Sequence, residues 1–136
     1  MDNKSNLVPS LTERADYYRL DEAAEMGRLL PEASAKGLEK ALAVNTEDLV
    51  SRARLLGYYH NRVKGRSAGS VLAAGAKTRH ILWFIKNVPD CKFAGDFIFS
   101  LPEKPFPKLF ETIKGAWETE SKAKDPQPQT LINFAL

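Results

Sequence analysis

The stretch from residue 70 to residue 88 is predicted to form a helix that is apolar on two sides, and this feature constrains the fold of the whole chain. One face carries Ala74, Thr78, Ile81, Ile85 and Val88. A second face, about 120° to 160° away by the 3.6-residue period, carries Ala76, His80, Trp83 and Asn87. Each apolar face of a helix needs a partner to cover it. We therefore expect this helix to be central, in contact with elements before and after it.

Other segments have helical periodicity and helix boundary signals. They cover residues 11–30, 33–44, 47–62, 108–122 and 129–136. Ser10 and Glu13 have the spacing of a capping box before the first of them, and Pro31 would end it. The 89–107 connection is rich in proline and phenylalanine, and we expect its phenylalanines to be buried. The chain is thus predicted to be all-α, with about five to six helices paired as antiparallel hairpins.

The length of 136 residues and the hydrophobic content of 43% suit one domain with its own core. Residues 1–10 are polar and predicted to be disordered, so residues 11–136 would form a single helical domain. Either residues 129–136 are a short capping helix, or the chain is the front part of a longer one. Cys91 is the only cysteine, which favours a reducing compartment. Without a signal-like N-terminal run or an apolar span of about 18 residues, we expect a cytoplasmic protein outside the membrane.

Charge is unevenly distributed along the sequence. Residues 1–48 hold six basic and ten acidic side chains, a net charge of −4. Residues 49–89 hold eight basic side chains and no acidic one, and residues 90–136 hold six basic and seven acidic ones. A basic block between acidic flanks either attracts an anionic partner or pairs with the acidic N-terminal part inside the fold.

Several short patterns resemble those of tetratricopeptide-repeat (TPR) proteins. Residues 56–59, Leu-Gly-Tyr-Tyr, are similar to the first-helix signature of a repeat, and Leu38 and Ala41 resemble the second helix of the preceding one. Residues 81–89 resemble the close of a repeat, and residues 117–136 resemble a junction that leads into a new first helix. The resemblance implies a degenerate TPR-like protein of bacterial type, with hairpins stacked as a short right-handed superhelix. It also implies protein binding and scaffolding without a cofactor.

The basic block supplies the candidate binding surface. Arg54, Tyr58 and Arg62 form one stripe of the 47–62 helix, opposite its core face, and Arg79 lies on the outer edge of the next helix. Together they would present guanidinium groups around an aromatic ring. We predict a non-catalytic protein–protein interaction or scaffold module that binds a protein or peptide through these residues. The alternative is an anion or nucleic-acid binder that uses the basic face of residues 49–89, and the C-terminal helix would support self-association.

The sequence contains no constellation that indicates catalysis or metal binding. His60 and His80 lie on neighbouring predicted helices, but two ligands without a nearby carboxylate or third histidine make a poor zinc site. Cys91 has no apparent orienting group that would make it a nucleophile. The glycine-rich 65–69 segment lacks the Lys-Ser/Thr ending of a P-loop. We therefore predict a chain that is not an enzyme and needs no cofactor or metal.

Overall fold

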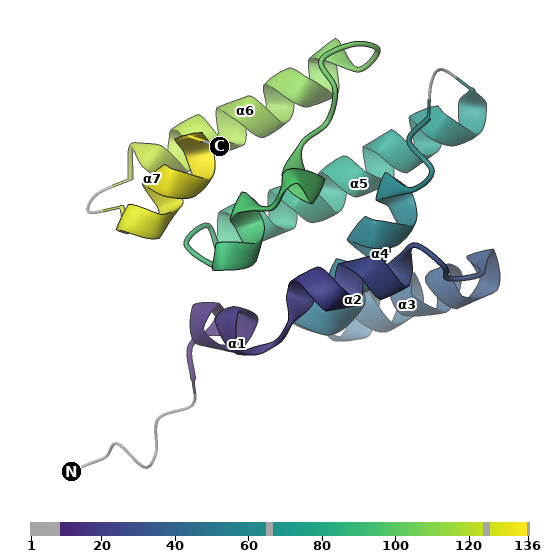
Figure 1. Ribbon diagram of the computed structural model, residues 1–136, viewed down its shortest axis with the longest axis horizontal. Coiled ribbons are helices and arrows are strands. Elements are labelled where there is room, and N and C mark those ends of the chain that lie inside the picture. Colours follow the sequence, from purple (N-terminus) through teal and green to yellow (C-terminus); the bar gives the residue numbers. More distant parts are fainter. Residues whose placement is uncertain (1–8, 65–66, 124–125, 136) are drawn as a thin grey trace.

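The computed structural model describes residues 9–64, 67–123 and 126–135, and within these ranges it is helical without a strand (Figure 1). The α-helices of this part are α1 (Leu11–Tyr17), α2 (Leu20–Gly27), α3 (Glu32–Val44), α4 (Leu49–His60), α5 (Ala68–Asn87), α6 (Pro107–Ser121) and α7 (Pro128–Ala135). Two short 3-10 helices, η2 (Lys92–Gly95) and η3 (Phe97–Phe99), connect α5 to α6. The all-α prediction is confirmed, with more helices than expected. The TPR-like superhelix stays a prediction.

Side-chain caps fix where several helices begin. The Ser10 hydroxyl accepts the backbone N–H of Glu13 at 3.1 Å, and the Glu13 carboxylate accepts that of Ser10 at 2.8 Å, which confirms the predicted capping box. Asp48 caps α4 and Ser67 caps α5, each by accepting the backbone N–H three residues later. The predicted disorder of the N-terminus falls mainly on residues 1–8, which lie outside the described part.

The prediction of one helix over residues 11–30 is wrong, because the chain breaks between α1 and α2. Tyr18 has an extended backbone, with φ −76° and ψ 145°. Leu11 and Leu20 are nine residues apart, so on a straight helix they would point in opposite directions. The break turns both toward the core: Leu20 is 1% exposed and Leu11 packs against the same cluster. Met26, which continues the three- and four-residue apolar spacing that predicts one helix from Leu11 and Ala15 onward, is exposed.

Helix α5 is central, as predicted. It contacts α4 on one side and α6 on the other, and Figure 1 shows it crossing the molecule between the α2–α3–α4 group and the α6–α7 pair. Neighbouring helices pack as antiparallel pairs. His80, Ile81, Phe84 and Ile85 are at most 1% exposed, so the helix is covered on more than one side.

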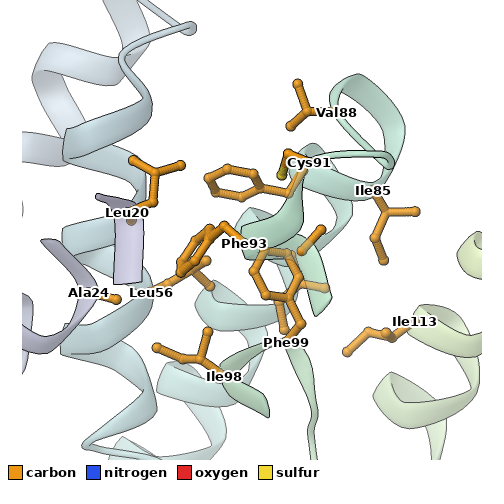
Figure 2. Packing of buried hydrophobic residues seen from close by; sticks show 14 of the residues in the cluster. Leu20, Ala24, Leu56, Ile85, Val88, Cys91, Phe93, Ile98, Phe99 and Ile113 are labelled. Atoms are coloured by element: carbon orange, nitrogen blue, oxygen red, sulfur yellow. The ribbon is translucent and has the colours of Figure 1, made fainter. Parts of the chain in front are cut away.

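The η2–η3 connection fills the space between α2, α4, α5 and α6. Figure 2 shows its side chains packed among those of the helices. Phe84, Phe93 and Phe99 meet edge to face, with ring centroids 5.2 to 5.5 Å apart. Phe106 is buried as well. The prediction that phenylalanines of the 89–107 connection lie in the core is confirmed for the three whose side chains are described here.

Helices α2 and α4 approach each other closely at two glycines. A Cβ atom added to Gly57 would fall 1.7 Å from the carbonyl oxygen of Ala24. One added to Gly27 would fall 1.9 Å from the carbonyl oxygen of Arg54. Backbone atoms cannot move aside as a flexible side chain can, so both positions require glycine. Gly57, part of the TPR-like pattern, therefore sets the distance between these helices.

Candidate functional site

The stripe of α4 that was predicted to bind a partner lies at the contacts of α4 with α2 and α3, and its residues are buried or half-buried. Tyr58 is 6% exposed and belongs to a small apolar cluster shared by α3 and α4. Arg62 covers its ring, with the guanidinium carbon 3.6 Å from the ring centroid, and its Nη1 donates to the Tyr58 carbonyl oxygen at 3.1 Å. The structure thus brings Tyr58 and Arg62 together. They contact each other, however, rather than forming a partner-binding surface.

The other two predicted residues have separate roles. Arg54 is half-buried at the contact of α4 with α2, where its carbonyl oxygen faces Gly27. Arg79 is exposed on α5, and its two terminal nitrogens donate to the Glu39 carboxylate at 3.3 Å each. Glu39 belongs to the acidic N-terminal part of the sequence. This pair is therefore an instance of the internal pairing that the charge distribution left open.

Glu39 is the centre of a polar network that joins α3, α4 and α5. Its Oε2 also accepts the Tyr59 hydroxyl at 2.6 Å and His80 Nε2 at 3.0 Å. Burial would raise the pKa of Glu39, but hydrogen bonds from His80, Arg79 and Tyr59 outweigh burial and hold this pKa far below its usual range. The carboxylate is ionised at neutral pH and fully used by its neighbours.

His80 is neutral within this network. Arg52 Nη1 lies 3.1 Å from Nδ1 of the ring, and a guanidinium only donates, so Nδ1 is the acceptor. The proton therefore sits on Nε2, which donates it to Glu39. Burial lowers the pKa of His80 although the nearby carboxylate raises it. The ring is fully buried and stacks on Tyr59, with centroids 5.9 Å apart.

Arg52 is the buried cation of the same network. Its Nη2 donates to the carbonyl oxygen of Thr46 at 2.7 Å, and its guanidinium carbon lies 4.1 Å from the centroid of the Trp83 ring. Burial lowers the pKa of Arg52 to about 10. Arg52 Nε is buried without a hydrogen-bond partner among the described residues. The other contacts link α3, α4 and α5, so the evident effect of the network is to hold these three helices together.

Lys77, on α5, is a second buried cation, and it contacts the end of α4 and the segment just after η3. It is 1% exposed, and its Nζ donates to the Ser100 carbonyl oxygen at 2.6 Å and lies 3.0 Å from Nδ1 of His60. Burial lowers the pKa of Lys77 to about 8. Burial, and then the charge of Lys77, lower the pKa of His60. Both residues border a cavity.

An apolar groove of about 460 Å³ lies between the η2–η3 segment, α6 and α7. Its apolar walls include Phe99, Leu101, Phe110, Ile113, Trp117 and Phe134. Asp96 and Lys114 also line it, one of each charge. A concave apolar surface with few charged groups is typical of a binding site for a hydrophobic side chain or ligand.

Helix α7, one wall of this groove, turns its polar side chains inward and its large apolar ones outward. Thr130 is 3% exposed and Asn133 is 4% exposed. By contrast, Leu131, Ile132 and Phe134 are 45%, 52% and 36% exposed, and we call these three residues the α7 stripe. A helix on the surface of a globular domain normally has the opposite orientation.

Asn133 explains this orientation. Its Nδ2 donates to the carbonyl oxygen of Pro89 at 2.9 Å and to that of Cys91 at 2.8 Å. Its Oδ1 accepts Nε2 of Gln129 at 2.9 Å. These bonds satisfy backbone acceptors just after α5, and they fix which side of α7 faces the core.

Cys91 and the histidines form no recognisable centre. Burial raises the pKa of the Cys91 thiol to about 12, and the side chain is fully buried in the core. Within the described ranges, no group of three or more His, Cys, Asp or Glu side chains could hold a metal ion. Nor does that part of the chain contain a helix long and apolar enough to cross a membrane.

Comparisons of this chain with protein-family models, with curated proteins and with solved structures found no match. The resemblance to TPR proteins therefore stays a prediction that rests on the sequence patterns.

Three features of this site were not predicted from the sequence. Lys77 carried a signal, because it is three residues after Ala74 and four before Ile81, on the predicted core face of its helix. Glu39 carried none, since its role depends on residues far away in the sequence. The orientation of α7 also had no local signal, because it is decided by the carbonyl groups that Asn133 reaches.

Proposed function

We propose that the chain is a non-catalytic protein-interaction module, and that it acts through the α7 stripe and the adjoining groove. The inverted orientation of α7 is the observation that carries this proposal. Burying a leucine, isoleucine or phenylalanine side chain is worth about 1.5–3 kcal/mol relative to exposure. In this fold Asn133 is buried and hydrogen-bonded, while Leu131 and Ile132 are exposed to solvent. A partner that covers these two apolar side chains would therefore gain binding free energy.

The binding partner that we propose for the α7 stripe is a second copy of the chain. Helix α7, from Pro128 to Ala135, has no charged side chain. Two identical helices can therefore face each other across a two-fold axis without like-charge repulsion, which a basic or acidic helix could not do. The stripe is also continuous with the groove through Phe134, which belongs to both.

The basic face receives less support as the binding surface. Arg52 and Lys77 are buried, Arg79 pairs with Glu39, and Arg62 lies on Tyr58. Much of this positive charge is thus buried or paired inside the fold and does not form an exposed basic surface. Nucleic-acid or anion binding through the exposed basic face of residues 49–89 is accordingly not our proposal. A cytoplasmic, TPR-like setting remains part of it, because the single cysteine suits a reducing compartment and the helices pair as hairpins.

Sedimentation velocity tests the proposal with a matched pair of double variants. Leu131→Asp with Ile132→Asp adds charge to the α7 stripe. Val71→Asp with Leu72→Asp, at positions 51% and 75% exposed on α5, makes the same chemical change elsewhere. We expect the parent and the α5 variant to form dimers as concentration rises from about 1 μM to about 200 μM, and the α7 variant to stay monomeric. If the parent is monomeric over this whole concentration range, or if the α7 variant dimerises like the parent, dimerisation through the α7 stripe is excluded.

A further inference from the structure

Lys77 has a hydrogen-bonding capacity that its neighbours do not fill. A lysine ammonium has three N–H donors. The Ser100 carbonyl oxygen takes one at 2.6 Å and His60 Nδ1 takes a second at 3.0 Å. Within the described part of the chain, these are the two acceptors that Lys77 contacts, which leaves one donor for a further acceptor.

The charge of Lys77 also lacks a counter-ion. Among the residues that the structure describes, the ion pairs formed by carboxylates involve other cations, and none of them reaches Lys77. An unpaired ammonium that is 1% exposed is costly for the fold. Burial lowers the pKa of Lys77 to about 8, so the amine is still mostly protonated at neutral pH. A negative charge brought beside it would relieve this cost.

The cavity next to Lys77 has room for a small molecule. Its volume is about 470 Å³, within the range of roughly 300–1,000 Å³ that is typical of ligand sites. Val63, Leu101, Pro102 and Phe110 supply apolar walls, and His60 and Glu103 supply polar ones. The site thus combines one buried cation with a mainly hydrocarbon surface.

We infer that this cavity binds a small apolar monocarboxylate, whose carboxylate accepts the third N–H of Lys77 and whose hydrocarbon part packs on Leu101 and Phe110. Glu103 on the cavity wall would repel a second negative charge, which limits the ligand to one. This inference does not rest on the proposed dimerisation, because Lys77 and His60 lie outside both the α7 stripe and the adjoining groove, although Leu101 and Phe110 line the groove as well as the cavity.

The other charged groups around the site act mainly on His60. Burial has the largest effect and lowers the pKa of His60, the charges of Lys77 and Arg28 lower it further, and Asp96 and Glu25 raise it. His60 therefore accepts from Lys77 throughout the neutral and alkaline range. Lys77 is then the group beside the ligand that changes charge between about pH 7 and about pH 9.5.

Calorimetric titration with phenylacetate and with 2-phenylethanol tests the inference. The two probes share a phenylethyl body, and only phenylacetate carries a negative charge. We expect saturable phenylacetate binding to the parent, with 2-phenylethanol at least tenfold weaker. Lys77→Met should weaken phenylacetate binding at least tenfold, because methionine has similar length and no charge. Lys86→Met, at an exposed lysine of the same helix, should leave it unchanged.

The pH dependence of the parent gives a second test that needs no variant. Only the protonated amine holds the carboxylate, so the affinity for phenylacetate should fall about thirtyfold between about pH 7 and about pH 9.5, given a pKa of about 8. The affinity for 2-phenylethanol should not follow this change. Equal binding of the two probes, a folded Lys77→Met variant that binds like the parent, or no saturable binding of phenylacetate at about pH 7 would each overturn the inference.

Discussion

The Cα of Gly57 faces the carbonyl oxygen of Ala24 so closely that a Cβ on Gly57 would fall 1.7 Å from that oxygen. This contact joins α2 to α4 and determines how near the two backbones lie. We predict that Gly57→Ala destabilises the protein by about 3 kcal/mol or more, because overpacking against backbone cannot be relieved by a side-chain rotation. Urea denaturation followed by circular dichroism measures this loss.

Gly75→Ala is the matched control for the glycine contact. Gly75 is an exposed residue within α5, and a Cβ there would meet no atom within 4 Å. Alanine is favoured over glycine in a helix by about 0.5–1 kcal/mol, so this variant should be more stable than the parent. If both alanine variants shift stability in the same direction, the close approach of α2 and α4 is not what Gly57 provides.

Glu39→Gln should weaken the network between α3, α4 and α5. An amide is neutral and accepts on one atom only, so Tyr59, His80 and Arg79 all lose a charged partner and at least one of their N–H or O–H donors loses its acceptor. We expect a loss of about 1–3 kcal/mol at neutral pH. The pKa of Glu39 is lowered in the fold, so its carboxylate stabilises above the unfolded value near pH 4.5 and ceases to do so as the pH falls. Parent and variant should converge in acid.

Glu32→Gln tests whether that loss is specific. Glu32 lies on the same helix and pairs with Lys36 at 3.4 Å on the surface, with both side chains 73% exposed. A surface pair of this kind contributes little, so the variant should differ from the parent by less than about 0.5 kcal/mol. Equal losses for the two glutamine variants would mean that Glu39 has no special role.

Lys77→Met should change how stability depends on alkaline pH. The unfolded lysine titrates near pH 10.5 and the folded one near pH 8, so between these values only the unfolded chain binds the proton. Stability of the parent should therefore rise by about 2–3 kcal/mol from pH 8 to pH 10.5 through Lys77 alone. Methionine lacks the titration, and the variant should be the more stable protein below pH 8.

Denaturation series across this pH range, run on the parent and the variant together, isolate the contribution of Lys77. Other groups titrate in both proteins, so the difference between the two curves is the quantity to compare. If the difference in the free energy of unfolding between parent and variant stays constant from pH 8 to pH 10.5, Lys77 is not a buried charged group in the folded protein.

The sequence was a good guide wherever local chemistry decides structure. Ser10 with Glu13 predicted a capping box, and the two apolar faces around Ile81 predicted a central helix. The sequence did not predict the helix break at Tyr18, because no proline or glycine marks it. The break depends on Leu11 and Leu20, which both pack into the core although they would point in opposite directions on one straight helix. The 3.6-residue pattern through Met26 was compatible with one helix, and only tertiary contacts select two.

The candidate site was less predictable than the fold. Tyr58 was placed on an exposed stripe because a helical wheel shows which residues share a side, but not how many sides are covered. Helix α4 contacts α2 and α3 as well as α5, so little of it reaches solvent. The same limit applies to Lys77 and Glu39, whose partners come from segments distant in sequence. The uneven charge along the sequence was compatible with ion pairs inside the fold. The structure identifies Arg79 and Glu39 as one such pair.

Asn133→Leu should release α7 from the body of the protein. The substitution removes the N–H donors to the carbonyl oxygens of Pro89 and Cys91, of which the Cys91 oxygen keeps a bond from the backbone N–H of Ala94 at 3.2 Å. The loss should cost about 1–3 kcal/mol. We expect backbone amides of α7 to exchange hydrogen roughly ten- to a hundredfold faster, while those of α5 stay protected. Hydrogen exchange followed by mass spectrometry resolves the two helices.

Gln129→Ala is the control for this anchor, because it removes only the bond from Gln129 Nε2 to Asn133 Oδ1, at a partly buried site. Its effect on α7 exchange should be several-fold smaller than that of Asn133→Leu. The two variants also connect the anchor with the proposed interaction, since the α7 stripe is presented only while Asn133 holds the helix. A chain in which α7 opens should therefore dimerise more weakly. If the hydrogen exchange of the α7 amides is the same in Asn133→Leu as in the parent, apolar contacts with α6 fix the helix and Asn133 does not.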